Sequence, residues 1–212
     1  PAAGVDPGVP NRLGSDRVRV RAYTPELEPG GSAWATLVWA HGGSFVRGTL
    51  DCPEADWVSR HFAEAGVQVY SVDYVLISDT VKAPAPSNDV AAVFQWAASR
   101  VAPSSPLVLG GASDGGHLAV LAALAQAEAA RDGDGRAADA VLLEYPTLHR
   151  VQRPDPALAA ATAALPEQRR FDSARIAQMY ASYLGDGAAP SVDAIAGEMP
   201  AARLALLPPT TM

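Results

Sequence analysis

The sequence predicts an α/β fold with a mostly parallel sheet and helices on both of its faces. Two observations carry this prediction: short apolar runs alternate with helix-like stretches along most of the chain, and a glycine-rich turn joins one apolar run directly to a helix pattern. Strands that alternate with helices pair in parallel, because a strand–helix–strand crossover returns the second strand to the same sheet. The chain has 212 residues, 49% of them hydrophobic and 18% charged, which suits a single globular domain over 1–212.

The order of elements along the chain supports this fold. Residues 1–16 are rich in Pro, Gly and Asp and predict a loose N-terminal arm, whereas the alternating segment 18–23 predicts a half-exposed strand. The core elements are predicted from continuous apolar runs, typical of buried parallel strands, and from apolar residues at helical spacing. The predicted strands cover 35–40, 67–75, 106–110 and 138–145. The predicted helices cover 53–65, the segment from an N-cap at Ser87 to about 101, and the segment from the turn after Ser113 to about 130.

Residues 147–200 differ in character from the chain before them. They are rich in loop-forming residues and contain one clear helix pattern, from Ser173 to Leu184, which Gly185 ends. Such an excursion between core strands predicts a lid-like cover segment over the functional site.

Charge and cysteine content narrow the classes of partner. The 16 basic and 23 acidic residues give a net charge of −7, which disfavours nucleic acid and anionic membranes, since both attract basic surfaces. No apolar run reaches the roughly 18 residues of a transmembrane helix. The lone cysteine, Cys52, cannot form an intramolecular disulfide, so a cytoplasmic location is expected. Cys52 lies just ahead of a helix pattern, which predicts a structural role for this residue. The expected partner is a small neutral molecule, without metal or cofactor, and a homodimer is compatible with the sequence.

Residues 111–115, Gly-Ala-Ser-Asp-Gly, have the Gly-x-Ser-x-Gly spacing of a nucleophile elbow. A serine on a tight strand-to-helix turn has a strained backbone, and Gly111 and Gly115 must be glycines because a Cβ there would collide with the strand or the helix. A strand pattern precedes the turn, and an unbroken helix pattern with Gly116 in its first turn follows it. We therefore predict that Ser113 is a catalytic nucleophile. The alternative is a glycine-rich turn without chemistry.

The surroundings of Ser113 predict an oxyanion hole. The N-terminus of the following helix favours developing negative charge, so the backbone N–H of Asp114 is expected to donate to the oxyanion, with the Asp114 carboxylate pointing away. The turn His41-Gly42-Gly43 follows a buried strand pattern, and its glycines allow the backbone to present the N–H groups of Gly42 and Gly43 to a substrate. His41, which opens this loop, is predicted to be a structural hydrogen-bonding residue rather than the base.

These motifs, in this order, resemble the hormone-sensitive-lipase-like family of α/β-hydrolases. That family has His-Gly-Gly-Gly, then Val-Asp-Tyr on the next strand, then Gly-x-Ser-x-Gly-Gly. Here residues 41–44 read His-Gly-Gly-Ser, residues 72–74 read Val-Asp-Tyr, and residues 111–116 match the third motif. The resemblance covers about residues 35–212. It implies an α/β-hydrolase fold and an esterase or lipase with Ser113 as the nucleophile.

The chain departs from the family pattern at a few positions. Ser44 replaces the third glycine of the first motif, Val75 replaces an arginine that usually follows the Tyr, and the elbow reads Ala-Ser-Asp at 112–114 where the family usually has Asp-Ser-Ala. These departures bear on substrate preference more than on fold.

The family places its catalytic residues in the order Ser, acid, His, each after a successive core strand. In the family a Leu-Pro-Pro-Thr-like segment leads into the strand before the acid, and here that segment, from Leu207 to Thr210, ends the chain. The acid and the His are therefore expected beyond Met212, and the last core strands are expected to be missing. Either the sequence lacks its C-terminal part, which the cost of a bare sheet edge favours, or the chain is a natural non-catalytic remnant.

The remaining histidines are poor candidates for the base. His117 follows Ser113 on the same predicted helix, from which the elbow aims the serine away, so a core role is predicted. His61 is predicted to be structural or solvent-facing, and His149 lies early in the cover segment, before the strand that should carry the acid.

The leading hypothesis is a serine hydrolase that cleaves carboxylic esters of short acyl groups through an acyl-enzyme on Ser113. An arylformamidase- or amidase-type hydrolase is an alternative, since arylformamidases share the His-Gly-Gly loop and the Gly-x-Ser-x-Gly elbow. A non-catalytic small-molecule-binding module is a third possibility, because plant gibberellin receptors resemble this family but lack the catalytic His.

Overall fold

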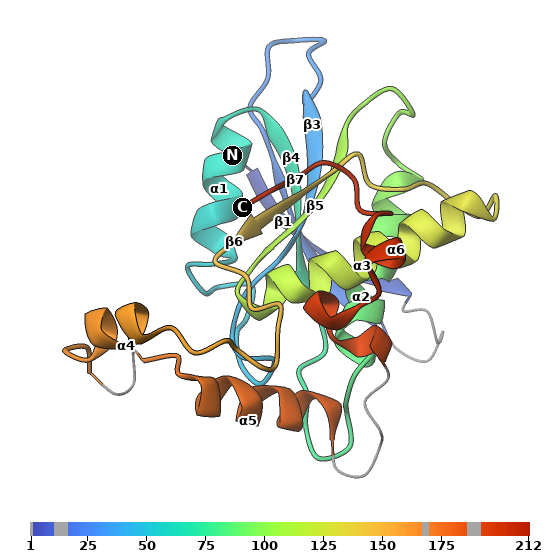
Figure 1. Ribbon diagram of the computed structural model, residues 1–212. Helices are drawn as coiled ribbons and strands as arrows, with labels where there is room; N and C mark the ends of the chain where they lie inside the picture. The colour runs from blue at the N-terminus through green and yellow to red at the C-terminus, as the bar shows by residue number, and fades with distance from the viewer. Residues whose placement is uncertain (1, 11–16, 167–169, 186–191) are drawn as a thin grey trace.

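A computed structural model describes residues 2–10, 17–166, 170–185 and 192–212. Among these residues the strands form one sheet in the order β1-β2-β4-β3-β5-β6-β7, with helices on both faces (Figure 1). This architecture confirms the predicted α/β fold. The strands are β1 (Ala2–Pro10), β2 (Arg17–Thr24), β3 (Ala35–Ala40), β4 (Val67–Asp73), β5 (Leu107–Ala112), β6 (Ala140–Glu144) and β7 (Thr210–Thr211).

Strand direction divides the sheet into two parts. β1 pairs antiparallel with β2, and β2 pairs antiparallel with β4. From β4 to β7 every neighbouring pair is parallel, as predicted for strands connected through helices. β3 lies between β4 and β5 and is buried along its whole length, which explains its continuous apolar sequence. The carboxyl ends of these parallel strands form the edge at which ligands bind in such sheets.

Helices pack against both faces of the sheet. α1 (Asp56–Glu64) covers one face, where Val58 and Ala63 belong to a core cluster with Trp39 of β3. α2 (Ala85–Ala98) and α3 (Asp114–Arg131) cover the other face and form the larger core cluster with the sheet. α3 is buried on most sides because it contacts the sheet, α2 and the C-terminal helical turns, so its apolar residues are not confined to one stripe.

The predicted loose arm over 1–16 is wrong where the structure describes it. Residues 2–10 form β1, an edge strand that pairs with β2. An edge strand tolerates proline, because one side of it needs no ladder hydrogen bonds, and the pairing register shifts between Asp6 and Val9. The Pro and Gly content that suggested a loop is therefore compatible with a strand at this position. The rest of the predicted arm lies outside the described residues.

Most predicted boundaries agree with the structure within a few residues. β3 and α5 (Ser173–Leu184) have the predicted bounds. α1 begins at Asp56 rather than Pro53, because the residues before it form turns. Ser87 is not the N-cap of α2: the helix begins earlier, and the Ser87 hydroxyl donates to the Pro84 carbonyl (2.9 Å) from within the first turn.

The cover segment 147–200 leaves the sheet after β6. α5 packs against the larger core through Ile176, Tyr180 and Tyr183. A further helix, α4, was not predicted; it has no buried residue and projects away from the sheet (Figure 1). The elements of this part of the chain are α4 (Pro156–Thr162), α5, two 3-10 turns (Val192–Ala194 and Ala196–Glu198) and, after the segment, α6 (Ala201–Leu204). Residues 167–169 and 186–191 of the segment lie outside the described residues.

The last element is a short strand. Thr210 and Thr211 form β7, which pairs in parallel with Val141 and Leu142 of β6. The core strand expected after the Leu-Pro-Pro segment therefore begins where the sequence predicts. Within the described part of the chain, every helix is too short or too polar to cross a membrane.

Candidate active site

Ser113 lies at the sharp turn between β5 and α3. Its backbone has φ 54° and ψ −120°, a conformation that costs about 1–3 kcal/mol for a residue with a side chain. The Ser113 N–H donates to the Glu144 carbonyl of β6 (2.9 Å), and the Ser113 carbonyl accepts from the Thr147 N–H (3.1 Å). These bonds hold the turn against the end of the neighbouring strand. The structure thus contains the strained strand-to-helix turn that the sequence predicts.

Close backbone contacts explain the glycines of the elbow. A Cβ on Gly111 would lie 2.4 Å from the carbonyl carbon of Gly115, and a Cβ on Gly115 would lie 2.2 Å from the carbonyl oxygen of His41. A Cβ on Gly116 would lie 3.0 Å from the Gly111 carbonyl oxygen. The first two distances are far below van der Waals contact, and the atoms concerned belong to packed backbone that cannot move aside.

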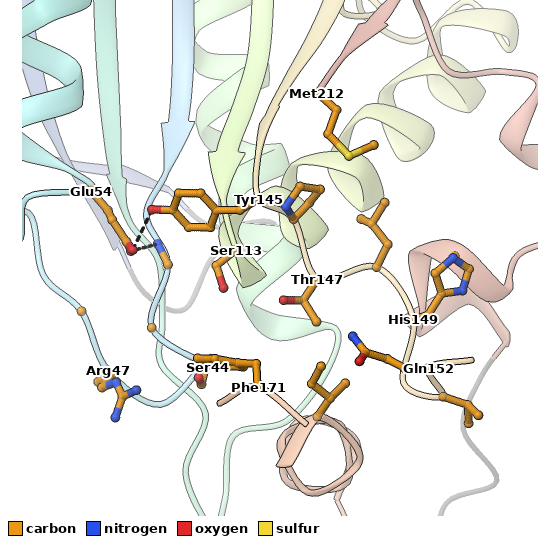
Figure 2. Close-up of a pocket in the computed structure, with 18 of the residues that line it drawn as sticks. Ser44, Arg47, Glu54, Ser113, Tyr145, Thr147, His149, Gln152, Phe171 and Met212 are labelled. Carbon is orange, nitrogen blue, oxygen red and sulfur yellow. Dashed lines mark hydrogen bonds between the residues drawn. The ribbon is translucent and has the colours of Figure 1, made fainter. Parts of the chain in front are cut away.

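Ser113 lines a cleft of about 1440 Å³. Figure 2 shows Ser113 between the pair Glu54–Tyr145 and Ser44, with Thr147 and His149 on the opposite wall. The walls come from the loop after β3, the chain after β6 and the cover segment. A cleft of this size can hold a small organic molecule.

The loop after β3 has an unusual backbone. Ser44 and Phe45 have φ angles of 58° and 63°, in the left-handed region that side chains rarely adopt. Glycine would take this conformation with less strain, which explains the third glycine in the family that the chain resembles. Phe45 is fully buried and stacks on Tyr183 of α5, with a centroid distance of 4.1 Å, so the cover segment anchors the loop.

The Asp114 carboxylate binds this loop, a contact that the sequence does not predict, and Asp114 is not among the described residues that line the cleft. Its Oδ1 accepts the N–H groups of Gly43 and Ser44, and its Oδ2 accepts the N–H of Phe45, each at 2.7 Å. Burial raises the pKa of the Asp114 carboxyl, and the backbone amides partly oppose that shift. The physical reason for this contact is that buried amides need acceptors, and α3 places a carboxylate against them.

The amide of Gly42 is also bonded to a carboxylate. Its N–H donates to Glu54 Oε2 (3.0 Å), and Glu54 Oε1 accepts from the Tyr145 hydroxyl (2.9 Å), as the dashed lines in Figure 2 show. Partial burial and the neighbouring Glu54 carboxylate raise the pKa of Tyr145, so this tyrosine is a neutral donor. Gly42 lies beside the nucleophile, since a Cβ on it would be 3.1 Å from the Ser113 Cβ. The predicted donors Gly42 and Gly43 thus lie beside or near Ser113 but donate to carboxylates.

Glu54 and Tyr145 are residues of the site that the sequence patterns do not predict. Tyr145 directly follows β6, at the carboxyl end of a parallel strand, and this position is a usable signal because ligands bind at such ends. Glu54 lies in a turn before α1 and is 91 residues from Tyr145 in the sequence. No local pattern marks such a contact.

His41 has the contacts of a structural residue, as predicted. Its Nδ1 lies 2.8 Å from the Gly42 carbonyl oxygen, and its ring stacks on Tyr74 at a centroid distance of 4.6 Å. The Tyr74 hydroxyl donates to the His41 carbonyl (2.8 Å). Burial, together with the nearby Asp114 carboxylate, raises the pKa of Tyr74 well above its usual value, so this donor stays neutral.

His117 is a core residue, which confirms the prediction. It is fully buried, with Nε2 3.0 Å from the Ala194 carbonyl oxygen and Nδ1 3.1 Å from the Tyr180 hydroxyl. Burial lowers the pKa of His117 to about 4, so its imidazole is neutral at pH 7.

The other two histidines also differ from a catalytic base in their contacts. His61 is exposed on α1, with Nδ1 2.8 Å from the Trp57 carbonyl oxygen. His149 lines the cleft, and its ring lies against Gly197, where a Cβ would be 2.4 Å from the His149 Cε1. Within the ranges that the structure describes, no histidine is hydrogen-bonded to the Ser113 hydroxyl.

The stability of the protein should fall as the pH drops from 6.5 toward 4. His117 has a pKa of about 4 when folded and about 6.5 when unfolded, so below pH 6.5 protons bind the unfolded chain preferentially. The difference corresponds to about 3 kcal/mol of unfolding free energy, fully present above pH 6.5 and lost by pH 4. Urea unfolding at pH 7.5 and 4.5 would measure it.

The control for this prediction is the variant His117→Gln, which cannot titrate and should lose less stability over that range. Asp114 acts in the opposite direction, because its raised pKa makes the folded protein hold a proton more tightly than the unfolded chain. The comparison is therefore between the pH dependence of the wild type and that of the variant. Equal pH dependence of the two proteins would contradict the prediction.

Comparison with known proteins supports this fold. A family described as alpha/beta hydrolase fold matches residues 37–212. The carboxylic ester hydrolase LipN of Mycobacterium tuberculosis is 34% identical over 134 residues, which covers 60% of this chain and 34% of LipN.

Solved structures of other proteins are also similar to this chain in fold. The esterase LipW from Mycobacterium marinum is similar with a TM-score of 0.71 and 27% identity, covering 99% of this chain and 61% of LipW. Brefeldin A esterase, a bacterial homologue of human hormone-sensitive lipase, is similar in fold with a TM-score of 0.77 and 21% identity, covering 99% of this chain and 58% of that protein. The chain thus spans less than two thirds of the length of each of these relatives.

The mostly parallel sheet with helices on both faces, and the serine elbow at the carboxyl end of β5, define the α/β-hydrolase fold. The chain belongs to the alpha/beta hydrolase fold family that matches residues 37–212. The fold that the resemblance to hormone-sensitive-lipase-like proteins implies is confirmed, since brefeldin A esterase is similar in fold.

Proposed function

We propose that this protein is a carboxylic ester hydrolase that cleaves esters of short acyl groups through an acyl-enzyme on Ser113. The nucleophile elbow carries the proposal: a serine in a strained backbone, at the N-terminus of α3, lines a cleft large enough for a small ester. The similarity to the ester hydrolase LipN and the esterase LipW supports the same type of reaction.

In the proposed reaction Ser113 Oγ attacks the ester carbonyl while its proton passes to a base. The tetrahedral intermediate then expels the alcohol, which takes up a proton, and leaves an acyl ester on Ser113. Water attacks this ester, releases the acid and restores the hydroxyl. The proposed oxyanion donors are the amides of Gly42, Gly43 and Asp114. Those of Gly42 and Gly43 must exchange their carboxylate acceptors for the substrate oxygen.

One observation favours a second candidate, a non-catalytic small-molecule-binding module. The amides of Gly42 and Gly43 donate to carboxylates, and within the described ranges no histidine is bonded to the Ser113 hydroxyl. A binding module needs the cleft but neither free amides nor a base. Measurement of turnover separates the two candidates.

The proposed cellular location and partners follow from the composition of the chain. We propose a cytoplasmic location, which the free thiol of Cys52 supports because thiols persist in reducing compartments. A small ester is the proposed partner, without cofactor, and the homodimer stays a prediction.

Burst kinetics test the proposal. The whole gene product mixed with p-nitrophenyl acetate should release p-nitrophenol in a stoichiometric burst followed by a slower steady rate, as expected when an acyl-enzyme forms faster than it hydrolyses. Mass spectrometry of acid-quenched protein should find an acetyl group on the peptide that contains Ser113. Saturable binding of the ester without burst or acetylation would support the binding module and contradict the acyl-enzyme.

Substrate comparisons refine the same experiment. p-Nitrophenyl acetate and butyrate should have higher kcat/KM values than the laurate if short acyl groups are preferred. Phenyl formate and formanilide form a matched pair of ester and formamide. Faster hydrolysis of formanilide would identify an arylformamidase-type enzyme instead.

A further inference from the structure

The carboxylate of Asp114, the residue that follows Ser113, binds the loop after β3. Asp114 Oδ1 accepts the N–H groups of Gly43 and Ser44, and Oδ2 accepts the N–H of Phe45, all at 2.7 Å. The Tyr74 hydroxyl lies 3.3 Å from Oδ2. The Asp114 side chain is fully buried, and within the described residues no cation pairs with it. Backbone amides are therefore the main groups that stabilise its negative charge.

The loop that carries these amides lies close to the nucleophile, since Gly43 and Ser44 line the same cleft as Ser113. Asp114 directly follows Ser113, and Gly42, at the start of the loop, approaches Ser113 so closely that a Cβ on Gly42 would be 3.1 Å from the Ser113 Cβ. An oxyanion formed on Ser113 needs N–H donors aimed at it. A carboxylate that holds the N–H groups of Gly43 and Ser44 withholds them from the oxyanion. Its negative charge also repels a second anion at short range.

We propose that Asp114 is a positioning residue that occupies the oxyanion loop as an internal carboxylate ligand and so weakens the binding of anionic tetrahedral adducts at Ser113. The proposal rests on the proposed function only in taking Ser113 as the reactive residue. The loop can receive an oxyanion when the Asp114 side chain turns away or carries a proton. Substitution of Asp114 should therefore strengthen the binding of an anionic adduct, whereas loss of a purely structural residue would weaken it.

Phenylboronic acid is the probe for this experiment. Ser113 Oγ forms a bond to boron, the hydroxyl proton passes to solvent, and boron becomes a tetrahedral anion without any turnover. In the whole gene product, Asp114→Ala should bind phenylboronic acid at least about tenfold more tightly than the wild type. One oxyanion donor is typically worth ~10²–10³-fold, and a loop freed of its ligand should retain part of this gain. Acetanilide, a neutral ligand of similar size, should bind both proteins equally.

Control variants separate charge from folding. Asp114→Asn removes the charge but keeps the side-chain volume, and should tighten phenylboronic acid binding in the same direction. Asp51→Asn removes an exposed carboxylate that pairs with Arg21 and does not line the cleft, and should leave the affinity unchanged. Ser113→Ala, combined with Asp114→Ala, should abolish the tight binding because no oxygen remains to bond boron.

The outcomes distinguish this proposal from the proposed function. Equal or weaker phenylboronic acid binding by both Asp114 variants, or failure of both to fold, would overturn it and leave Asp114 a structural role alone. A change in acetanilide binding equal to the change in phenylboronic acid binding would also overturn it, because charge would not be the cause. Tighter adduct binding without ester hydrolysis in any variant would contradict the proposed function and support this proposal.

Discussion

Ser113→Ala should lower ester hydrolysis by the whole gene product by about 10⁶-fold, the scale typical for removal of a serine nucleophile. The substitution removes only Oγ, and the described structure gives that atom no hydrogen bond that the fold would lose. The backbone bonds from Ser113 to Glu144 and Thr147 do not involve the side chain. The free energy of unfolding should therefore stay within about 0.5 kcal/mol of the wild-type value.

Hydrolysis of p-nitrophenyl acetate and urea unfolding measure the two halves of this prediction. Ser99→Ala is the matched control, because Ser99 is an exposed serine whose hydroxyl donates to the Trp96 carbonyl at the end of α2, away from the cleft. It should leave kcat/KM unchanged. Unaltered turnover in Ser113→Ala would show that another residue is the nucleophile. If turnover is lost because the variant unfolds, Ser113→Cys is the variant that tests the role of Ser113.

Gly115→Ala should destabilise the fold by about 3 kcal/mol or more, at the high end for overpacking. The added Cβ would lie 2.2 Å from the His41 carbonyl oxygen and 2.3 Å from the Ala40 carbonyl oxygen. Ala40 ends β3 and His41 directly follows it, and β3 is buried and paired on both sides, so relief requires α3 to move away from the sheet. That movement would also displace Ser113, and activity should fall with stability.

Gly133→Ala is the control for this substitution. Gly133 has φ +82°, but a Cβ there would have no neighbour within 4 Å, so the variant reports left-handed strain without a clash. It should cost about 1 kcal/mol. Circular dichroism during guanidinium unfolding would measure both variants. A Gly115→Ala variant no less stable than Gly133→Ala would show that the elbow can relax, and the steric account of the motif would be wrong.

The nucleophile could be predicted from sequence because its requirements are local. The strand β3, the glycines around Ser113 and the helix Ser173–Leu184 each follow from patterns within a single short segment. The position of the loop 42–45 near Ser113 was predicted from its His-Gly-Gly motif. The structure explains it, because the parallel strands β3 and β5 are neighbours and place their carboxyl ends at the same edge.

The partners of the loop amides could not be predicted in the same way. Asp114 and Gly43 are 71 residues apart in the sequence, and no spacing rule says which acceptor a buried amide finds. The sequence predicted the direction of the Asp114 carboxylate from the charge of an oxyanion alone, and the contacts of this carboxylate with the loop amides were not predicted because the need of those amides for acceptors has no local pattern. The prediction of a loose N-terminal arm was wrong for a related reason, because the local Pro and Gly content does not reveal that residues 2–10 pair with β2.

The sequence by itself determined that this chain forms an α/β-hydrolase sheet and places Ser113 on a strained elbow, since turn sterics and periodicity act between residues close together in the chain. Only the tertiary structure decided that carboxylates of Glu54 and Asp114 hold the amides beside that serine. Those contacts depend on how the end of β3 approaches α3 and the turn before α1. The physical reason is that hydrogen-bond partners of buried groups are chosen by packing in three dimensions, where residues far apart in the chain compete for the same donor.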